Sequence, residues 1–416
     1  MPETVGQPVE EEIPNCDENK IKPYQLPDPL HFIDGRPVTV AQDWPERHQE
    51  ILRLFEQTLY GATPHLAVET RCEVWSVDTK ALHGKATRKQ VRLVFSAAAR
   101  TLQLDLLLYL PNTRPRPAQI FVGLNFSGNH AIQTDAAIAL AKAWMAEGPG
   151  VVDHHATELT RGVESRRWPV ERILERGYAV ATAYYGDLDP DYDDGFQNGV
   201  QPLAYQADQT RPGADEWGSI GAWAWGLSRI MDYLQTDPDV DAGRVSLLGH
   251  SRLGKTALWA GAQDERFALV ISNDSGCGGA ALSRRNFGET VASITRAFPH
   301  WFCDNFKAYG QRVQDLPVDQ HMLVALIAPR PVYIASAEED VWADPRGEFL
   351  SAYHASPVYH LLGLDGLAAE GMPGVEQPIL SRIGYHIRRG GHDVTIYDWD
   401  RFMDFADRYL NVHGDD

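Results

Sequence analysis

The sequence predicts an α/β fold, a three-layer sandwich in which helices cover both faces of a doubly wound, mostly parallel sheet with antiparallel N-terminal strands. Two observations support this. Residues 67–112 alternate in polarity as antiparallel strands do, and from Gln119 onward near-continuous apolar runs alternate with helical segments. The chain has 416 residues, 44% of them hydrophobic, which is ample for a large core. Without a visible linker or repeat, we expect an extended lead-in over 1–35 and a single domain over 36–416.

The predicted elements follow one another along the chain. A helix opens at Asp43-Trp44-Pro45-Glu46, where a capping residue precedes a first-turn proline, and runs to Gly61. Strands are expected at 89–96, 102–110, 120–126, 178–185, 267–272, 331–337 and 385–388. Helices are expected at 216–234 and at 399–410. A further helix is expected directly after a serine that the next paragraph describes. The polar segment 147–169 lacks periodicity and is typical of a surface loop near a site.

One stretch carries the strongest chemical signal. An apolar run ends in Gly249-His250-Ser251, and a helix rich in small residues follows. This strand–turn–helix context presents a serine as a nucleophile, although the second glycine, Gly254, stands three residues after Ser251 instead of two. The alternative is a serine that caps a buried helix.

A serine nucleophile needs a base and an acid that orients the base. In α/β-hydrolase sheets the three follow in the order serine, acid, histidine, each after a strand. Here Ser251 is followed by Asp274 or Asp340 and then by His392, with two glycines before the histidine. Asp340 is preferred because it follows the later strand, whereas Asp274 lies in a sequence typical of a turn.

Two basic residues stand close to this serine. Arg252 follows it directly, and a guanidinium there is favoured only beside negative charge. A developing oxyanion at Ser251 is such a charge, and a salt bridge with a loop carboxylate is the alternative. Lys255 lies one turn further on and either reaches the same site or is a surface lysine.

Composition excludes several other classes of function. The net charge is −19 without a Lys/Arg block, so we expect no nucleic-acid partner. No apolar run reaches the length that spans a membrane, and no basic-then-apolar leader begins the chain. The four cysteines have no metal-ligand spacing. Cys277 and Cys303 are either bridged or free, and we expect neither a cofactor nor a metal.

The stretch from Gly249 to Lys255 resembles the Gly-x-Ser-Arg-x-Gly-Lys signature of the glucuronoyl esterases, carbohydrate esterase family 15, in their bacterial form. Further motifs support the resemblance from about residue 40 onward, among them 167–169, 184–191, 276–279, 340–345 and 391–393. It implies an α/β-hydrolase that cleaves the ester between 4-O-methyl-glucuronic acid of glucuronoxylan and lignin alcohols.

The resemblance also implies residue roles. Ser251 is then the nucleophile, His392 the base and Arg252 the oxyanion partner, while Lys255, Glu289 and Trp342 contact the sugar. Fungal members carry a glutamate where Asp274 stands, and many bacterial members carry an aspartate at the Asp340 position. The shorter Asp274 favours Asp340 as the triad acid.

We therefore predict a cofactor-free serine esterase, a monomer that takes glucuronoxylan or a lignin–carbohydrate ester as substrate. A deacetylase for acetylated xylan and an inactive carbohydrate-binding protein on the same fold are the alternatives. The family is normally exported, which predicts a secreted or periplasmic protein, whereas the missing leader leaves a cytoplasmic one open.

Overall fold

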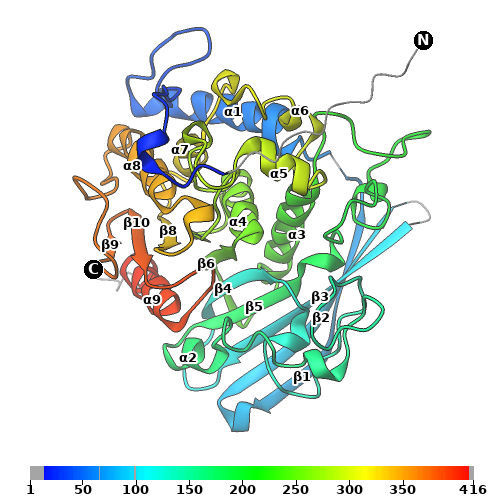
Figure 1. The fold of residues 1–416 in the computed structure, drawn as a ribbon. Helices are drawn as coiled ribbons and strands as arrows, with labels where there is room; N and C mark the ends of the chain where they lie inside the picture. Colours follow the sequence, from blue (N-terminus) through cyan, green and yellow to red (C-terminus); the bar gives the residue numbers. More distant parts are fainter. Residues whose placement is uncertain (1–13, 65, 98–99, 412–416) are drawn as a thin grey trace.

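The centre of the computed structural model, which describes residues 14–64, 66–97 and 100–411, is one mixed sheet (Figure 1). Its strand order is β1-β2-β3-β5-β4-β6-β7-β8-β10-β9. The strands are β1 (Glu69–Ala81), β2 (Ala86–Ala97), β3 (Arg100–Pro111), β4 (Ala118–Asn125), β5 (Ala179–Tyr184), β6 (Val240–His250), β7 (Leu269–Asn273), β8 (Val332–Ala337), β9 (Ile379–Leu380) and β10 (Ile383–Arg388).

The directions of these strands match the predicted sheet. Strands β1, β2 and β3 pair antiparallel, and β3 also pairs antiparallel with β5. From β5 through β4, β6, β7 and β8 to β10 every pairing is parallel. The two-residue strand β9 adds an antiparallel edge that the sequence did not predict.

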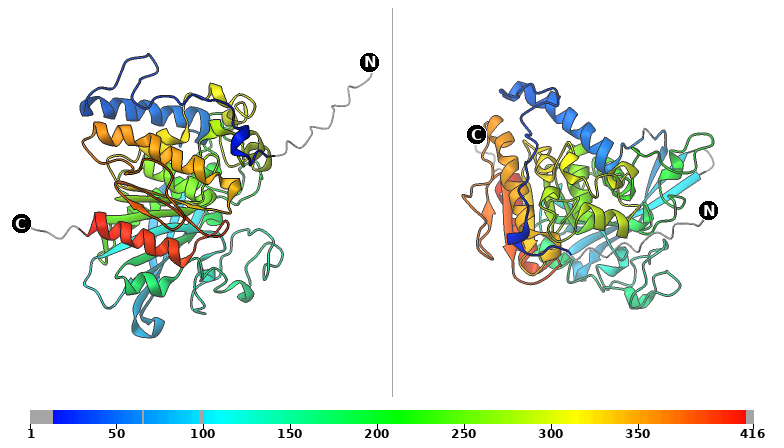
Figure 2. Two further views of the ribbon diagram at one scale, coloured as in Figure 1. Left: turned by 60° about the vertical axis from the view of Figure 1, so that its left-hand side comes forward. Right: turned by 45° about the horizontal axis from the view of Figure 1, so that its top comes forward.

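Helices cover both faces of the sheet, as predicted. They are α1 (Trp44–Phe55), α2 (Val170–Glu175), α3 (Ser219–Leu234), α4 (Arg252–Gln263), α5 (Val291–Ala297), α6 (Asp304–Lys307), α7 (Gln320–Ala325), α8 (Pro345–Leu361) and α9 (Ile396–Leu410). Helices α2 and α9 pack on one face, and α1, α3, α4, α7 and α8 form a larger layer with the other face. Figure 2 shows α9 on one side of the sheet and α8 with α1 on the other.

Alternation along the central strands explains why two cores form. In β4, Ile120, Val122 and Leu124 belong to the larger core, and Phe121 between them belongs to the smaller one. Because both faces are covered, both sets of side chains are apolar, and the strand is a continuous hydrophobic run.

Two predicted helix boundaries are wrong by three residues. Helix α3 begins at Ser219 and not at 216, because Trp217 and Gly218 donate backbone hydrogen bonds to Ala62 and Tyr60 and so remain extended. Helix α9 begins at Ile396 and not at 399, because Thr395 caps it together with Asp398.

The described part of the lead-in lies against the body of the protein. Residues 14–35 are mostly extended, with one short helical turn at Glu18–Lys20. Asn15 accepts a backbone hydrogen bond from Gly288, and Glu18 pairs with Arg285 at 2.6 Å. The predicted boundary near residue 35 stays a prediction.

The structure also bears on two expectations from the sequence, the state of the cysteines and the lack of a membrane-spanning segment. Cys277 and Cys303 are buried free thiols, which is one of the two alternatives considered. None of the helices in the described part of the chain is both long and apolar enough to cross a membrane.

Candidate active site

Ser251 stands at a sharp turn between β6 and α4. Its backbone has φ 56° and ψ −129°, a conformation that a non-glycine residue rarely adopts. A Cβ on Gly249 would lie 1.8 Å from the carbonyl oxygen of Leu253, and one on Gly254 would lie 3.0 Å from the Ser275 side chain. The two glycines therefore allow the close approach of strand, turn and helix that presents Ser251 in a strained conformation.

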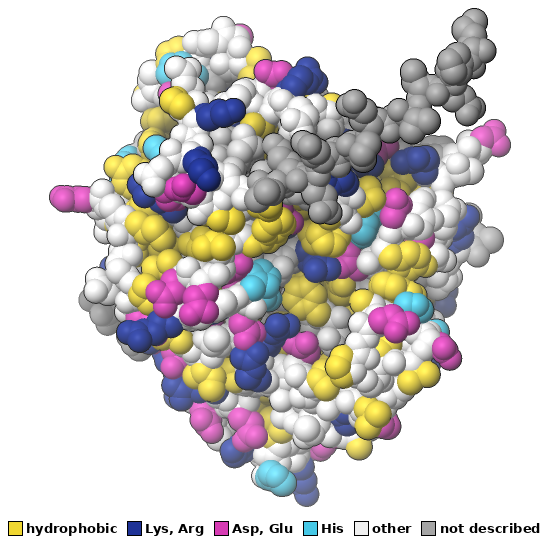
Figure 3. Space-filling view, viewed as in Figure 1, with side chains coloured by type: hydrophobic (Ala, Val, Ile, Leu, Met, Phe, Trp, Pro, Cys, Tyr) yellow, Lys and Arg dark blue, Asp and Glu magenta, His cyan; other side chains and the backbone are white. Residues whose placement is uncertain are grey.

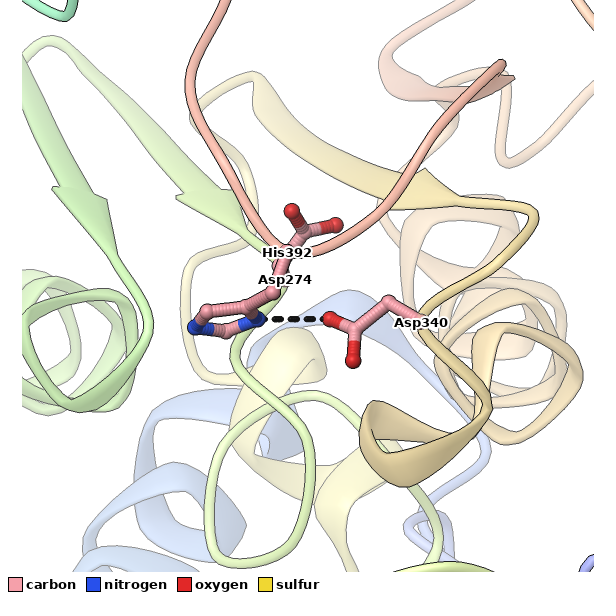
Figure 4. Close-up of side chains that lie close together, drawn as sticks. All are labelled: Asp274, Asp340 and His392. Carbon is pink, nitrogen blue, oxygen red and sulfur yellow. Dashed lines mark hydrogen bonds and ion pairs between the residues drawn. The ribbon is translucent and has the colours of Figure 1, made fainter.

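His392 and Asp340 meet beside this turn. Nδ1 of His392 lies 2.6 Å from Oδ2 of Asp340 (Figure 4). The carboxylate side chain is 6% exposed and the imidazole 44%, so a buried acid holds a ring that reaches solvent. The His392 ring centroid lies 4.5 Å from that of His250, the residue before Ser251. Loops after β6, β8 and β10 thus bring all three predicted triad residues to one edge of the sheet.

Asp274 has different partners. It is almost fully buried after β7 and accepts hydrogen bonds from Arg388 (3.1 Å), from Asn273 (3.2 Å) and from the backbone of Asp393 (3.3 Å). Burial, reinforced by the charge of Glu348, raises the pKa of the Asp274 carboxyl well above its ordinary value. These contacts make Asp274 an anchor for the segment that carries His392.

Arg388 ties that segment together. Its guanidinium donates to the carbonyl oxygens of Arg389 and Gly391 at 3.0 Å each and also to that of Asp393. It pairs with Asp398 at 2.8 Å as well as with Asp274. Backbone on both sides of His392 is therefore bonded to one buried cation, which restricts where the imidazole can lie.

His386, six residues before His392, belongs to this buried framework. It lies in β10 and is fully buried, with Nε2 2.8 Å from Asp398 and Nδ1 3.0 Å from the Tyr333 hydroxyl. Burial lowers its pKa, against the opposing effect of Asp398.

Arg252 makes the salt bridge that was its alternative role, and it also keeps one donor free. Its NH1 group pairs with Asp191, which further accepts hydrogen bonds from His300 (2.9 Å) and Trp301 (2.6 Å). Although burial of Asp191 works in the opposite direction, His300 and the Arg252 charge lower the pKa of that carboxyl. Nε of Arg252 is buried and has no hydrogen-bond partner within the described structure.

Lys255 and Glu289 form a second charged pair close by. Their Nζ and Oε2 atoms are 3.8 Å apart, and Nζ also donates to the carbonyl oxygen of Ser275 at 2.5 Å. Burial raises the pKa of Glu289, and Lys255 opposes this. Lys255 is buried, so its alternative role as a surface lysine is wrong.

The backbone of Glu289 bonds to the carbonyl oxygen of Trp342, three positions before the start of α8 and two after Asp340. Trp342 is 45% exposed, so its ring lies at the surface and not in the core.

Glu348 in α8 supports the site from below, and the sequence did not indicate it. It is completely buried beneath the site, where its Oε1 accepts the backbone N–H groups of Ser275 (2.7 Å) and Gly276 (3.0 Å). Its Oε2 accepts the Ser336 hydroxyl at 2.6 Å. Glu348 therefore joins the loop after β7 to the end of β8. Burial raises its pKa to about 8.

Asp274, Asp340 and His392 each offer one atom within 4.8 Å of the others, a spacing that a metal ion also accepts. In this protein the Asp340 oxygen is bonded to His392, and Asp274 is paired with Arg388. Both carboxyl groups therefore have hydrogen-bond partners within the protein itself.

One face of the molecule carries charges of both signs. On the face in Figure 3, Lys and Arg side chains are interspersed with Asp and Glu, and hydrophobic side chains gather across the middle. This mixture suits a ligand with both polar and apolar surface better than a polyanion.

Comparisons with known sequences relate the chain to one group of enzymes. A family model described as glucuronyl esterase of fungi matches residues 212–363. Carbohydrate esterase MZ0003, from an unknown prokaryotic organism, is 50% identical over 402 residues, which cover 95% of this chain and 92% of that protein. A 4-O-methyl-glucuronoyl methylesterase of Phanerochaete carnosa is 31% identical over 82% of this chain and 73% of its own length.

Comparison with solved structures relates the chain to the same group of enzymes. A promiscuous esterase of carbohydrate esterase family 15 from a marine bacterial metagenome matches with a TM-score of 0.89 and 50% identity, covering 95% of this chain and all of that one. A glucuronoyl esterase from Solibacter usitatus gives a TM-score of 0.88 and 47% identity over 93% of this chain and 98% of its own.

Proposed function

The chain belongs to the glucuronoyl esterases of carbohydrate esterase family 15, and we propose that Ser251, His392 and Asp340 are the triad with which it hydrolyses glucuronic acid esters. The observation that carries this assignment is the 2.6 Å bond between His392 and Asp340 beside the strained turn of Ser251. The fold of the chain is that of the α/β-hydrolases, in which this arrangement of residues performs acyl transfer.

Hydrolysis proceeds in two acyl-transfer steps. His392 takes the hydroxyl proton of Ser251 as Ser251 attacks the uronoyl carbonyl, and Asp340 holds the imidazole and balances its positive charge. His392 then gives the proton to the leaving alcohol. A water molecule, activated by the same imidazole, releases glucuronate from Ser251.

Arg252 stabilises the oxyanion that forms on the carbonyl oxygen. Its buried Nε–H lacks an acceptor within the described structure, and such an unpaired donor costs about 1–3 kcal/mol. Asp191 fixes the rest of the guanidinium, so the free donor is pre-oriented. An acceptor that appears only in the transition state recovers the cost at that point, which is the condition for catalysis.

Lys255, Glu289 and Trp342 form the sugar site. Lys255 and Glu289 offer charged hydrogen-bonding groups to the sugar hydroxyls, and the half-exposed Trp342 ring offers an apolar face. The substrate we propose is the ester between 4-O-methyl-glucuronic acid of glucuronoxylan and a lignin alcohol. Such a polymer lies in the plant cell wall, so we place the enzyme outside the cell.

A matched pair of substrates tests the proposal. Ser251→Ala should abolish hydrolysis of methyl glucuronate while the circular dichroism spectrum stays that of the wild type. Retained turnover would remove Ser251 from the mechanism. Faster release of acetate from acetylated xylose than of methanol from methyl glucuronate would instead support a deacetylase.

A further inference from the structure

A hollow lies near the antiparallel end of the sheet. This side pocket, of about 310 Å³, is lined among others by Trp75, Gln103, Asp105, Lys142, Asp187 and Asn198. Its walls come from β1, β2, β3, the end of β5 and the loops after β4 and β5. Its volume is at the lower limit of ligand sites and is sufficient for one or two sugar rings.

Trp75 is presented to this pocket by an irregularity in an edge strand. Val74 pairs with Val91 and Ser76 with Gln90, so Trp75 is an extra residue in β1, a β-bulge. Such bulges re-aim a side chain. The indole is 38% exposed, and the guanidinium of Arg92 lies 5.8 Å from its ring centroid. Arg92 is itself fixed by Asp105 at 2.8 Å, and Asp105 lines the pocket. The guanidinium next to the Trp75 ring is therefore held in place by a residue of the pocket.

The polar groups of the pocket indicate the kind of ligand. Asp187 contributes a carboxyl whose pKa is raised to about 7 by burial and by the neighbouring Asp105. Exposed Gln103 adds an amide, and exposed Lys142 an ammonium group. An aryl ligand would leave these groups without hydrogen bonds. Asp105 is already paired with Arg92, and among the described residues Asp187 has no salt-bridge partner, so the pocket disfavours a further carboxylate next to Asp187. A neutral sugar has neither disadvantage: its hydroxyls pair with the polar groups of the pocket, and the apolar face of its ring packs on the indole.

The pocket and the active site share a loop and an edge of the sheet. Asp187 and Asp191, the partner of Arg252, are four residues apart, so their Cα atoms are separated by at most about 14 Å. Asn129 after β4 and Gly186 after β5 line the pocket, and Ser251 follows β6, the other neighbour of β4. A polysaccharide chain that offers an ester to Ser251 is long enough to reach the pocket.

We propose that the side pocket is a remote saccharide subsite that binds neutral sugar units of the polysaccharide carrying the ester. Trp75 is its stacking platform. The inference depends on the proposed function only for the identity of that polysaccharide, a xylan. Binding here holds the polymer near Ser251 without touching the reacting atoms, so it lowers KM for polymeric substrates and leaves small esters unaffected.

Two measurements on the full chain test this subsite. Xylohexaose should bind the wild-type protein in calorimetry, and Trp75→Ala should weaken that binding about tenfold. The same variant should lose about tenfold in kcat/KM on a xylo-oligosaccharide bearing methyl-esterified 4-O-methyl-glucuronate. Its kcat/KM on methyl glucuronate should stay within twofold of the wild type.

Val74→Ala is the matched control, because Val74 is an exposed neighbour on the same strand that does not line the pocket. Gln103→Ala, inside the pocket, should act in the same direction as Trp75→Ala. The proposal would be overturned by any of three results: equal binding of xylohexaose by wild type and Trp75→Ala, no binding of xylohexaose at all, or competition between xylohexaose and methyl glucuronate. Because binding is measured without turnover, a failure of the esterase assignment would be seen separately as loss of methyl glucuronate hydrolysis by the wild type.

Discussion

Replacing Asp340 by Asn tests which acid supports the histidine. The carboxylate accepts the Nδ1–H bond of His392 at 2.6 Å, and the amide keeps its size but loses the charge. An Asn that donates to Nδ1 selects the tautomer with the proton on Nε2, which cannot take the proton of Ser251. In a triad of this kind the substitution costs about 10⁴ in kcat. Asp274 lies within 4.8 Å of the same atoms and offers a partial substitute, so we expect a loss of about 10³.

Asp274→Asn is the matched control for this substitution. Its carboxylate is paired with Arg388, so its loss should lower kcat by less than tenfold while it lowers the melting temperature. Both variants are assayed on methyl glucuronate, with KM near the wild-type value because neither acid contacts the substrate. A kcat for Asp340→Asn within tenfold of the wild type, or a larger loss for Asp274→Asn, would refute the assignment.

Three further predictions follow from other contacts. Arg252→Ala should lower kcat on methyl glucuronate by about 10²–10³ through loss of the oxyanion donor, and a change confined to KM would contradict this role. Gly249→Ala should abolish activity and lower the melting temperature, since its Cβ would lie 1.8 Å from the Leu253 oxygen; a variant as stable and active as the wild type would contradict the geometry. Because burial raises the pKa of Glu348 to about 8, the folded protein keeps a proton that the unfolded chain releases, and stability should fall from about pH 5 to 8. Glu348→Gln, which remains uncharged, should reduce that slope in thermal melts between pH 5 and 9, and equal slopes would argue against it.

The fold was largely predictable because most of its strands are buried on both faces. The apolar run 120–126 predicted β4, which spans Ala118–Asn125, and 331–337 predicted β8 equally well. Helix α8 was missed because it is buried along much of its circumference and contains Pro357, so no apolar stripe marks it. The start of α9 was within reach of the sequence, since Thr395 and Asp398 have the spacing of a capping box.

The residues of the candidate site could be predicted from the sequence where they directly follow a strand. Ser251, Asp340 and His392 were selected by position and order alone, and Glu289 by resemblance to a family. Asp191, Arg388 and Glu348 were missed because each acts on a residue distant in sequence. Asp191 pairs with Arg252, 61 residues on, and Arg388 with Asp274, 114 residues back. Such pairings follow from the order of strands in the sheet, which no local pattern encodes.

The charge arrangement of the site favours release of the product. Arg252 and Lys255 lie in the first turn of α4, directly after the proposed nucleophile, and each is already paired with a carboxylate, Asp191 or Glu289. The ester substrate is neutral and leaves this balance intact. Hydrolysis creates a uronate that must compete with two fixed carboxylates for two cations, in a chain of net charge −19. On the proposed mechanism, the free Nε–H of Arg252 therefore meets negative charge chiefly during the reaction, when the oxyanion exists, and the paired carboxylates keep the same cations from retaining the acid afterwards.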